Sequence, residues 1–229
     1  YAEASSQGRK QSQNLERTWI AARAKDVGVV GRAKAPIDLP SARLFPDIGQ
    51  ASMHTDLLNT HDDVMVSFRS SPFGAFNHMH ADQNAFQIHH GGRKLLNNAG
   101  YYCVYGDEHF RNYYQASRGH NTVLIDDKGQ AEGGSSNGEI AAKSYGWIAR
   151  FLNGKRIGYC LGDASNAYPG TGLLRFRRHL VLLRSPSSSG SAVILVYDDL
   201  LADHDAEWTW LLHSGKEIVL ADANRLTLP

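Results

Sequence analysis

The stretch that decides the fold is Leu173-Leu174-Arg175-Phe176-Arg177-Arg178-His179-Leu180-Val181-Leu182-Leu183. Its first half alternates apolar with basic residues, and its second half is wholly apolar. Alternation with period two is typical of a β-strand, because successive side chains of a strand point to opposite faces of the sheet. We therefore predict a strand that runs from a wet, cationic face into the core of an antiparallel sheet.

Segments rich in β-branched and aromatic residues recur on both sides of this stretch. The predicted strands are 51–58, 64–70, 85–90, 122–126, 140–152, 156–162, 173–184, 192–198 and 208–213. Clusters of Gly, Asn, Asp and Pro separate them, as short connections between strands require. The sequence predicts a mainly β fold, a large antiparallel β-sandwich.

The start of the chain has a different pattern. Residues 5–25 are polar, with apolar side chains at roughly helical spacing, and predict one amphipathic helix. Prolines then mark a connector. We predict a helix and connector at 1–38 and the sandwich at 39–229. The chain opens at Tyr1 with neither an initiator Met nor a signal-like region, so we expect an excerpt of a longer protein.

Composition excludes several classes of partner. The 24 Lys and Arg residues nearly balance the 23 Asp and Glu residues, for a formal charge of +1. Such a chain has no overall field to attract nucleic acid or anionic lipid. Its longest apolar runs are far shorter than the roughly 20 residues of a membrane span. Only Cys103 and Cys160 are present, which excludes a disulfide-dense scaffold and leaves one bridge open.

The densest polar cluster is Ser70-Ser71-Pro72-Phe73-Gly74-Ala75-Phe76-Asn77-His78-Met79-His80-Ala81-Asp82-Gln83-Asn84. Side chains at i and i+2 of an extended segment project to one side, so His78 and His80 are suited to a metal or an anion. The alternative is that both merely flank a polar loop. A core does not tolerate so many hydrogen-bonding groups without partners, which favours a functional loop.

This cluster and several later motifs resemble one protein family. They are similar to the C-terminal β region of heparinase II/III-like polysaccharide lyases, with oligoalginate lyases closest in appearance. The similarity runs in order from about Leu39 to Ser214. The motifs that carry it are 68–74, 78–86, 100–102 and 120–123 (His-Asn-Thr-Val), followed by 162–164 with Tyr168, 175–179 and 208–214.

The resemblance implies an α-helical toroid followed by a β-sandwich, with residues 1–38 as the remnant of the toroid. It also implies β-elimination at a uronic acid, in alginate or oligoalginate first and in heparin-like chains second. A base removes the C5 proton, the uronate carboxylate is neutralised, and an acid protonates the leaving oxygen. The family's principal catalytic Tyr lies in the toroid, so we expect this piece to be inactive alone. The family implies a periplasmic or secreted location, and a homodimer of the full-length parent stays open.

Residue roles follow the motifs of the family. His78 is then the catalytic histidine that faces the substrate, and His80 and His120 are ligands of a zinc ion. The third zinc ligand of the family is an Asp, and Asn98 stands at its place. An amide oxygen is a poorer zinc ligand than a carboxylate, so a hydrogen-bonded His/Asn cluster without an ion is the alternative.

A second group of candidates surrounds these histidines. Tyr105 is the candidate for the other half of an acid/base pair, and the predicted substrate contacts are Arg69, Asn77, Gln83, His109 and Arg177. On the 173–183 strand, Arg175 and Arg177 share one face, and Arg178 takes the other. These arginines could clamp a uronate carboxylate, or they could instead form ion pairs with Asp163, Asp198 or Asp199.

Other residues carry no predicted role. We expect His213, on an apolar strand, to be a hydrogen-bonded core histidine, and His204 to be a surface or turn residue. Two other protein classes compete with a lyase. One is a cupin-like metal oxygenase or isomerase, although Asn84 stands where its Glu ligand belongs. The other is a non-catalytic carbohydrate-binding sandwich with exposed aromatic residues such as Trp147, Trp208 or Trp210, of which we expect the last two to be at least half buried.

Overall fold

The computed structural model describes residues 35, 37–75, 78–100, 104, 107–132, 138–185 and 192–228. Within it, Ile37–Pro229 forms one compact unit. The predicted helix at 5–25 lies outside the described residues. No helix of the described ranges is long and apolar enough to cross a membrane.

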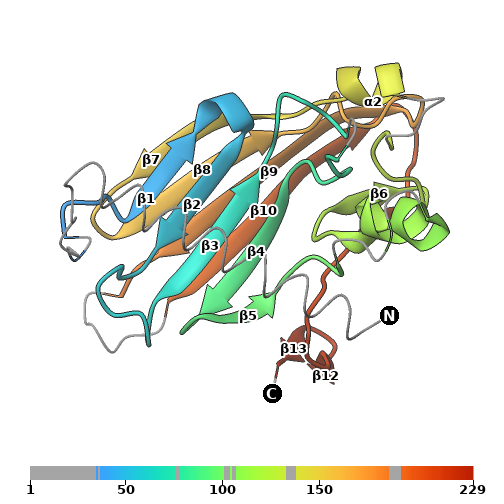
Figure 1. Ribbon diagram of the computed structural model, residues 1–229. Coiled ribbons are helices and arrows are strands. Elements are labelled where there is room, and N and C mark those ends of the chain that lie inside the picture. Colours follow the sequence, from blue (N-terminus) through green and yellow to red (C-terminus); the bar gives the residue numbers. More distant parts are fainter. Residues whose placement is uncertain are drawn as a thin grey trace, which may run out of the picture. The chain divides into compact units, whose positions relative to one another are not determined.

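Two antiparallel sheets hold most of the strands (Figure 1). The first has the order β1-β2-β3-β4-β5, with bounds Ala42–Phe45, Gln50–His54, Val64–Arg69, Ala85–His90 and Arg93–Leu96. The second has the order β10-β9-β8-β7, with bounds Val193–Ala202, Leu173–Leu183, Ile157–Asp163 and Trp147–Asn153. The mainly β, antiparallel fold predicted from the sequence is confirmed.

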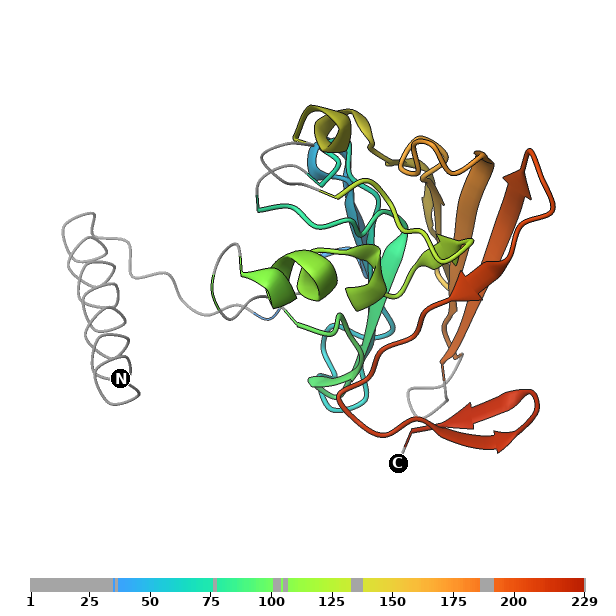
Figure 2. The same cartoon turned by 90° about the vertical axis from the view of Figure 1, so that its right-hand side faces the viewer.

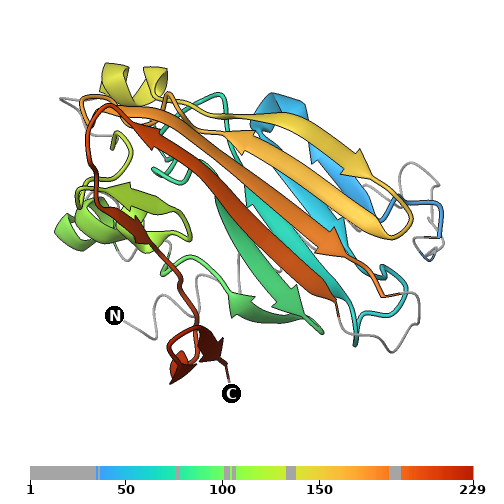
Figure 3. The same cartoon turned by 180° about the vertical axis from the view of Figure 1, so that it is seen from behind.

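The two sheets stack face to face, as the side and rear views show (Figures 2 and 3). Their shared core joins Met53, Val66 and Phe68 of the first sheet to Leu180 and Leu182 of the second. At Gly162 of β8, an added Cβ would lie 2.6 Å from the ring of Phe68. The close packing of the layers therefore requires a glycine at this position.

Smaller elements flank the two sheets (Figure 1). Strand β6 (Val123–Ile125) pairs with β11 (Trp208–Trp210), and both contribute to a second apolar cluster with Phe176 of β9. The short helical turns are η1 (Pro46–Ile48), the π-helical turn η2 (Phe110–Tyr114), η3 (Ser117–Gly119) and α2 (Gly138–Lys143). A hairpin of β12 (Val219–Asp222) and β13 (Arg225–Thr227) follows.

The predicted strand at 140–152 is wrong in its first part. Residues Gly138–Lys143 form helix α2, and only Trp147–Asn153 is a strand. Glu, Ile, Ala, Ala and Lys include strong helix formers, and Glu139 and Lys143 make an i,i+4 ion pair on the helix surface. Strands β1, β5, β12 and β13 were not predicted.

Candidate functional site

Two loops that are distant in sequence meet beside the sandwich. One runs from His78 to Asn84, between β3 and β4, and the other leads from η2 into β6. The backbone amide of Ala81 donates to the carbonyl of Gln115 at 2.8 Å, and Ser117 Oγ donates to the carbonyl of Ala81 at 2.8 Å. These contacts bring the His-x-His motif and the His-Asn-Thr motif together.

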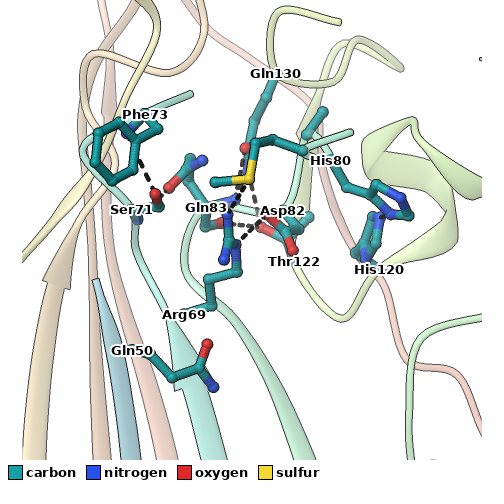
Figure 4. Close-up of polar contacts among 12 residues, drawn as sticks. Gln50, Arg69, Ser71, Phe73, His80, Asp82, Gln83, His120, Thr122 and Gln130 are labelled. Carbon is teal, nitrogen blue, oxygen red and sulfur yellow. Dashed lines mark hydrogen bonds and ion pairs between the residues drawn. The ribbon is translucent and has the colours of Figure 1, made fainter. Parts of the chain in front are cut away.

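Gln83 fixes this arrangement from inside (Figure 4). Its side chain is 1% exposed, and its carboxamide oxygen accepts a 2.6 Å hydrogen bond from the amide of Ser71. Its backbone is bonded at both ends by Gln130, whose Oε1 accepts from the amide at 2.7 Å and whose Nε2 donates to the carbonyl at 2.8 Å. Thr122 Oγ1 donates to the same carbonyl at 3.0 Å. Gln83, predicted to contact substrate, thus lies within the scaffold of the site.

His80 and His120 face each other at the meeting point of the loops (Figure 4). His80 Nδ1 lies 3.2 Å from His120 Nε2, and the ring centroids are 5.2 Å apart. His120 is fully buried, and its Nε2 also lies 3.1 Å from the carbonyl oxygen of Tyr114. Because a carbonyl only accepts, this contact assigns the proton of a neutral His120 to Nε2.

Burial keeps both imidazoles neutral at pH 7. It lowers the pKa of His120 to about 4 and also lowers the pKa of His80, although the nearby Asp82 carboxylate opposes the shift. Neutral imidazole is the form that binds metal ions. The environment therefore suits the role that the motif predicts for this pair.

Two of the three predicted zinc ligands carry unmet hydrogen-bond acceptors. His120 Nδ1 and Asn98 Oδ1 are buried, and neither has a hydrogen-bond partner in the structure. The amide of Ala99 donates to the carbonyl of Gly119 at 2.9 Å, which aligns the Asn98 segment with the His120 segment. Among the described residues, no group of three or more His, Cys, Asp and Glu side chains is arranged for a metal. A site here would depend on the amide oxygen of Asn98.

Two further candidates that the structure describes, His78 and Arg69, are at least partly exposed. His78 is exposed, and Asn77 and Tyr105 lie outside the described residues. Arg69 Nε donates to Asp82 Oδ1 at 2.8 Å, and its guanidinium also contacts Met79 Sδ at 3.6 Å (Figure 4). The Arg69 side chain is 22% exposed, so one edge of this ion pair is open to solvent.

Aromatic rings pack on one another around Tyr114, whose carbonyl oxygen contacts His120. His109 is exposed and packs edge to face on Tyr114, with centroids 4.5 Å apart. His213 is half-buried, and its ring Nδ1 lies 3.2 Å from Asn121 Oδ1, which also accepts the His213 amide at 2.6 Å. His213 is hydrogen-bonded as predicted, but it follows the end of β11 and is half-buried, so the prediction of a core histidine on a strand is wrong.

The arginines of β9 form the ion pairs that the sequence left as an alternative to a clamp. Arg177 Nε donates to Asp163 at 2.8 Å, and Arg175 Nε and Arg178 Nε contact Asp199 and Asp198 at 2.8 and 2.7 Å. The Arg177 side chain is half-exposed, so its outer nitrogens remain open to solvent. Contact between Arg177 and a substrate stays a prediction.

The family model described as heparinase II/III-like, C-terminal, matches residues 37–228. The chain belongs to this family, which confirms the resemblance and removes the cupin-like alternative.

Solved structures share the fold. A heparan sulfate lyase HepC from Pedobacter heparinus has a TM-score of 0.64 and 18% identity over 90% of this chain. The heparinase III-BT4657 gene product has a TM-score of 0.59 and 17% identity over 79% of this chain. The aligned parts are 31% and 25% of the lengths of those proteins. No curated protein matches the chain.

Three residues at the site were not predicted from the sequence. Gln130, Thr122 and Ser117 hold the two loops together through side-chain hydrogen bonds. Thr122 lies in the His-Asn-Thr motif, which could have indicated it. Gln130 has no local signal, because its partners are far away in the sequence. Cys160 is a buried free thiol, and Cys103 lies outside the described residues.

Proposed function

We propose that this domain is part of a polysaccharide lyase that cleaves uronate-containing chains by β-elimination, with alginate or oligoalginate as its substrate class and heparin-like chains as the second candidate. The observation that carries the proposal is the meeting of the two histidine loops, which places the partly buried His80 against the fully buried His120, in a region that also holds an exposed His78 and a partly exposed Arg69. The motifs favour alginate, whereas the solved neighbours are named as heparinase III and a heparan sulfate lyase.

The chemistry requires charge neutralisation above all. A proton next to a carboxylate is only weakly acidic, so donors must stabilise the charge that develops on the uronate as C5 loses its proton. The bond from C4 to the glycosidic oxygen then breaks, a C4–C5 double bond forms, and the leaving oxygen receives a proton. In this proposal His78 donates to the substrate, Tyr105 supplies or removes a proton, and His109, Arg69, Asn77 and Arg177 contact the sugar.

We also propose that His80, Asn98 and His120 hold a Zn²⁺ ion. The unpartnered Nδ1 of His120 and Oδ1 of Asn98 support it, because a cation would satisfy both lone pairs. The ion would fix the shape of the site by joining the two loops. The alternative is a cluster of hydrogen bonds that does so without an ion.

The parent protein is proposed to act in the periplasm or outside the cell. The reason is that a charged polysaccharide cannot cross a bilayer unaided. The acidic polysaccharide or oligosaccharide proposed as the substrate would then be bound outside the cytoplasmic membrane.

The lyase proposal is tested on the full-length parent. Incubation with alginate, heparan sulfate and hyaluronan is followed by ultraviolet absorbance, because elimination alone creates an unsaturated uronate. We expect the fastest rise on alginate and a loss of about 10²- to 10⁴-fold in His78→Ala. His90→Ala, an exposed histidine at the far end of β4, is the control and should keep its rate. No rise on any polyuronate overturns the proposal.

Metal analysis tests the zinc site separately. We expect about one zinc ion per purified chain, lost in His120→Ala and kept in the surface variant His204→Ala. A wild-type chain that stays metal-free after dialysis against zinc would instead support the hydrogen-bonded cluster.

A further inference from the structure

Arg178 is a fully buried arginine at the centre of the sandwich. Its Nε and Nη2 each donate to one carboxylate oxygen of Asp198 at 2.7 Å. Its Nη1 donates to two backbone carbonyls, Asn84 at 2.8 Å and Asn121 at 2.7 Å. One guanidinium therefore makes four hydrogen bonds, and only two of them are to its ion-pair partner.

The two carbonyls belong to the two loops of the candidate site. Asn84 ends the loop that carries His80, and Asn121 directly follows His120. Asn84 has a φ of +58°, in the left-handed region that non-glycine residues rarely adopt. Such a conformation persists only where surrounding contacts fix it, and the Arg178 hydrogen bond is one of those contacts.

Side-chain hydrogen bonds of the same asparagines complete the anchorage. Asn84 Nδ2 donates to the carbonyls of Gly162 and Phe176 at 3.2 and 3.3 Å, and Asn121 Nδ2 donates to the carbonyl of Phe86 at 2.9 Å. Both loops are thereby attached to the strands of the sandwich, with Arg178 between them.

Aromatic rings enclose the guanidinium. Its Cζ lies 5.5, 5.3 and 5.9 Å from the ring centroids of Phe86, Phe176 and Trp210, and Trp210 Nε1 donates to Asp198 at 3.1 Å. A charge in such a place is costly to desolvate, and apolar residues often stabilise a core as well as a buried ion pair does. A leucine at this position would have no hydrogen-bond donors. The planar guanidinium of Arg178 donates to both loops and to a carboxylate at the same time.

We infer that Arg178 is a positioning residue for the candidate site, which sets the relative placement of the His80 and His120 loops through the carbonyls of Asn84 and Asn121. Its relevance to catalysis rests on the proposed lyase function. Arg175 provides a natural comparison, because it lies on the same strand but pairs with Asp199 on the outer, partly exposed face.

The test is hydrogen–deuterium exchange on Arg178→Lys, with Arg175→Lys as the matched control, in this chain and in its full-length parent. Lysine keeps the positive charge beside Asp198 but cannot reproduce the planar set of donors of the guanidinium. We expect about tenfold faster exchange in peptides that contain the amides of Ala85 and Thr122, which bond within the two loops. Peptides within β9 and β10 should keep the wild-type rate, and the control should match wild type everywhere.

Two results overturn the inference. Unchanged exchange at both loops would show that Arg178 does not hold them, and equal acceleration across the sandwich would show that it only stabilises the fold. If Arg178→Lys does not fold, Trp210→Phe is measured, because it removes one donor to Asp198 from a side chain that is 47% exposed. In Trp210→Phe, a smaller acceleration of exchange confined to the same two loops supports the inference. Unchanged exchange in both loops overturns it.

Activity gives an independent reading in the full-length parent. We expect Arg178→Lys to lower kcat roughly 10²-fold with little change in KM, because misplaced groups lose transition-state contacts more than binding contacts. A wild-type protein without lyase activity would remove the proposed function and leave the exchange experiment intact. An active variant with wild-type kcat would overturn the positioning role.

Discussion

The pair of His80, which is partly buried, and His120, which is fully buried, differs from the exposed His204 in how its surroundings shift the pKa of an imidazole. Burial lowers the pKa of both members of the pair. His204 is 40% exposed, and its two ring nitrogens contact Asp203 at 2.7 Å and Asp126 at 2.6 Å. The hydrogen bonds to Asp203 and then Asp126 raise the pKa of His204.

This difference separates two uses of histidine. A desolvated imidazole keeps a lone pair for a ligand, whereas an imidazole between two carboxylates is favoured in its charged form and joins an ion-pair cluster. In the His204 cluster, Asp126 also accepts the amide of Glu207 at 2.9 Å. The cluster therefore ties the end of β6 to the turn before β11, which is a structural role.

The largest expected effect is a loss of stability of the metal-free protein in acid. His120 has a pKa of about 4 when folded and about 6.5 when unfolded, so folding favours its neutral form. The contribution of neutral His120 to the free energy of unfolding is complete above pH 6.5 and is lost as the pH falls toward 4. A difference of about 2.5 pKa units corresponds to about 3 kcal/mol in the free energy of unfolding. Urea unfolding at pH 7 and pH 4.5, in the presence of a chelator, measures it.

The control for this prediction is His120→Gln. Glutamine cannot titrate, yet its amide can still donate to the carbonyl of Tyr114. Carboxylates elsewhere also titrate in this range, so the quantity to compare is the difference between the two proteins at each pH. Equal acid sensitivity in the two proteins would contradict the assignment to His120.

The main strands could be predicted from the sequence, because a half-buried strand has a period-two pattern that survives without knowledge of its partners. The sequence does not predict the edge strand β5, because Arg93 and Lys94 protect the edge of the sheet and give no alternation of apolar and polar residues. Helix α2 ends a few residues before β7 begins, so the apolar pattern of residues 140–152 predicts one continuous strand.

The candidate site likewise contains residues that could be predicted from the sequence and residues that could not. The histidines that meet in the structure were identified through motif resemblance, which encodes long-range contacts that spacing alone does not contain. The hydrogen bonds from Gln130 to Gln83, from Arg178 to the carbonyls of the two loops, and from His204 to Asp126 join residues far apart in the sequence. Such contacts follow from the packing of the sheets, and no local pattern could have indicated them.

A smaller effect of opposite sign is expected at His204. Its folded pKa is raised, so its contribution to stability is complete below pH 6.5 and is lost as the pH rises through the raised value. Solvent screens this exposed cluster, so the change should be well below that of His120. Thermal unfolding of wild type at pH 6 and pH 9 should show a modest fall in Tm. His204→Gln should lack this component, and an identical fall in the variant would refute it.

The smallest effect concerns the charge state of His204 alone. Asp203→Asn removes the hydrogen bond that is the largest single cause of the raised pKa, and the contact with Asp126 remains in place. The pKa of His204 should therefore fall toward its ordinary value and stay above it. A titration followed by the ring signals of His204 in nuclear magnetic resonance spectra measures this shift. Asp205→Asn, a neighbouring exposed carboxylate, should leave the titration unchanged. An equal shift in both variants would mean that general surface charge, and not the two specific hydrogen bonds, distinguishes His204 from the pair of His80 and His120.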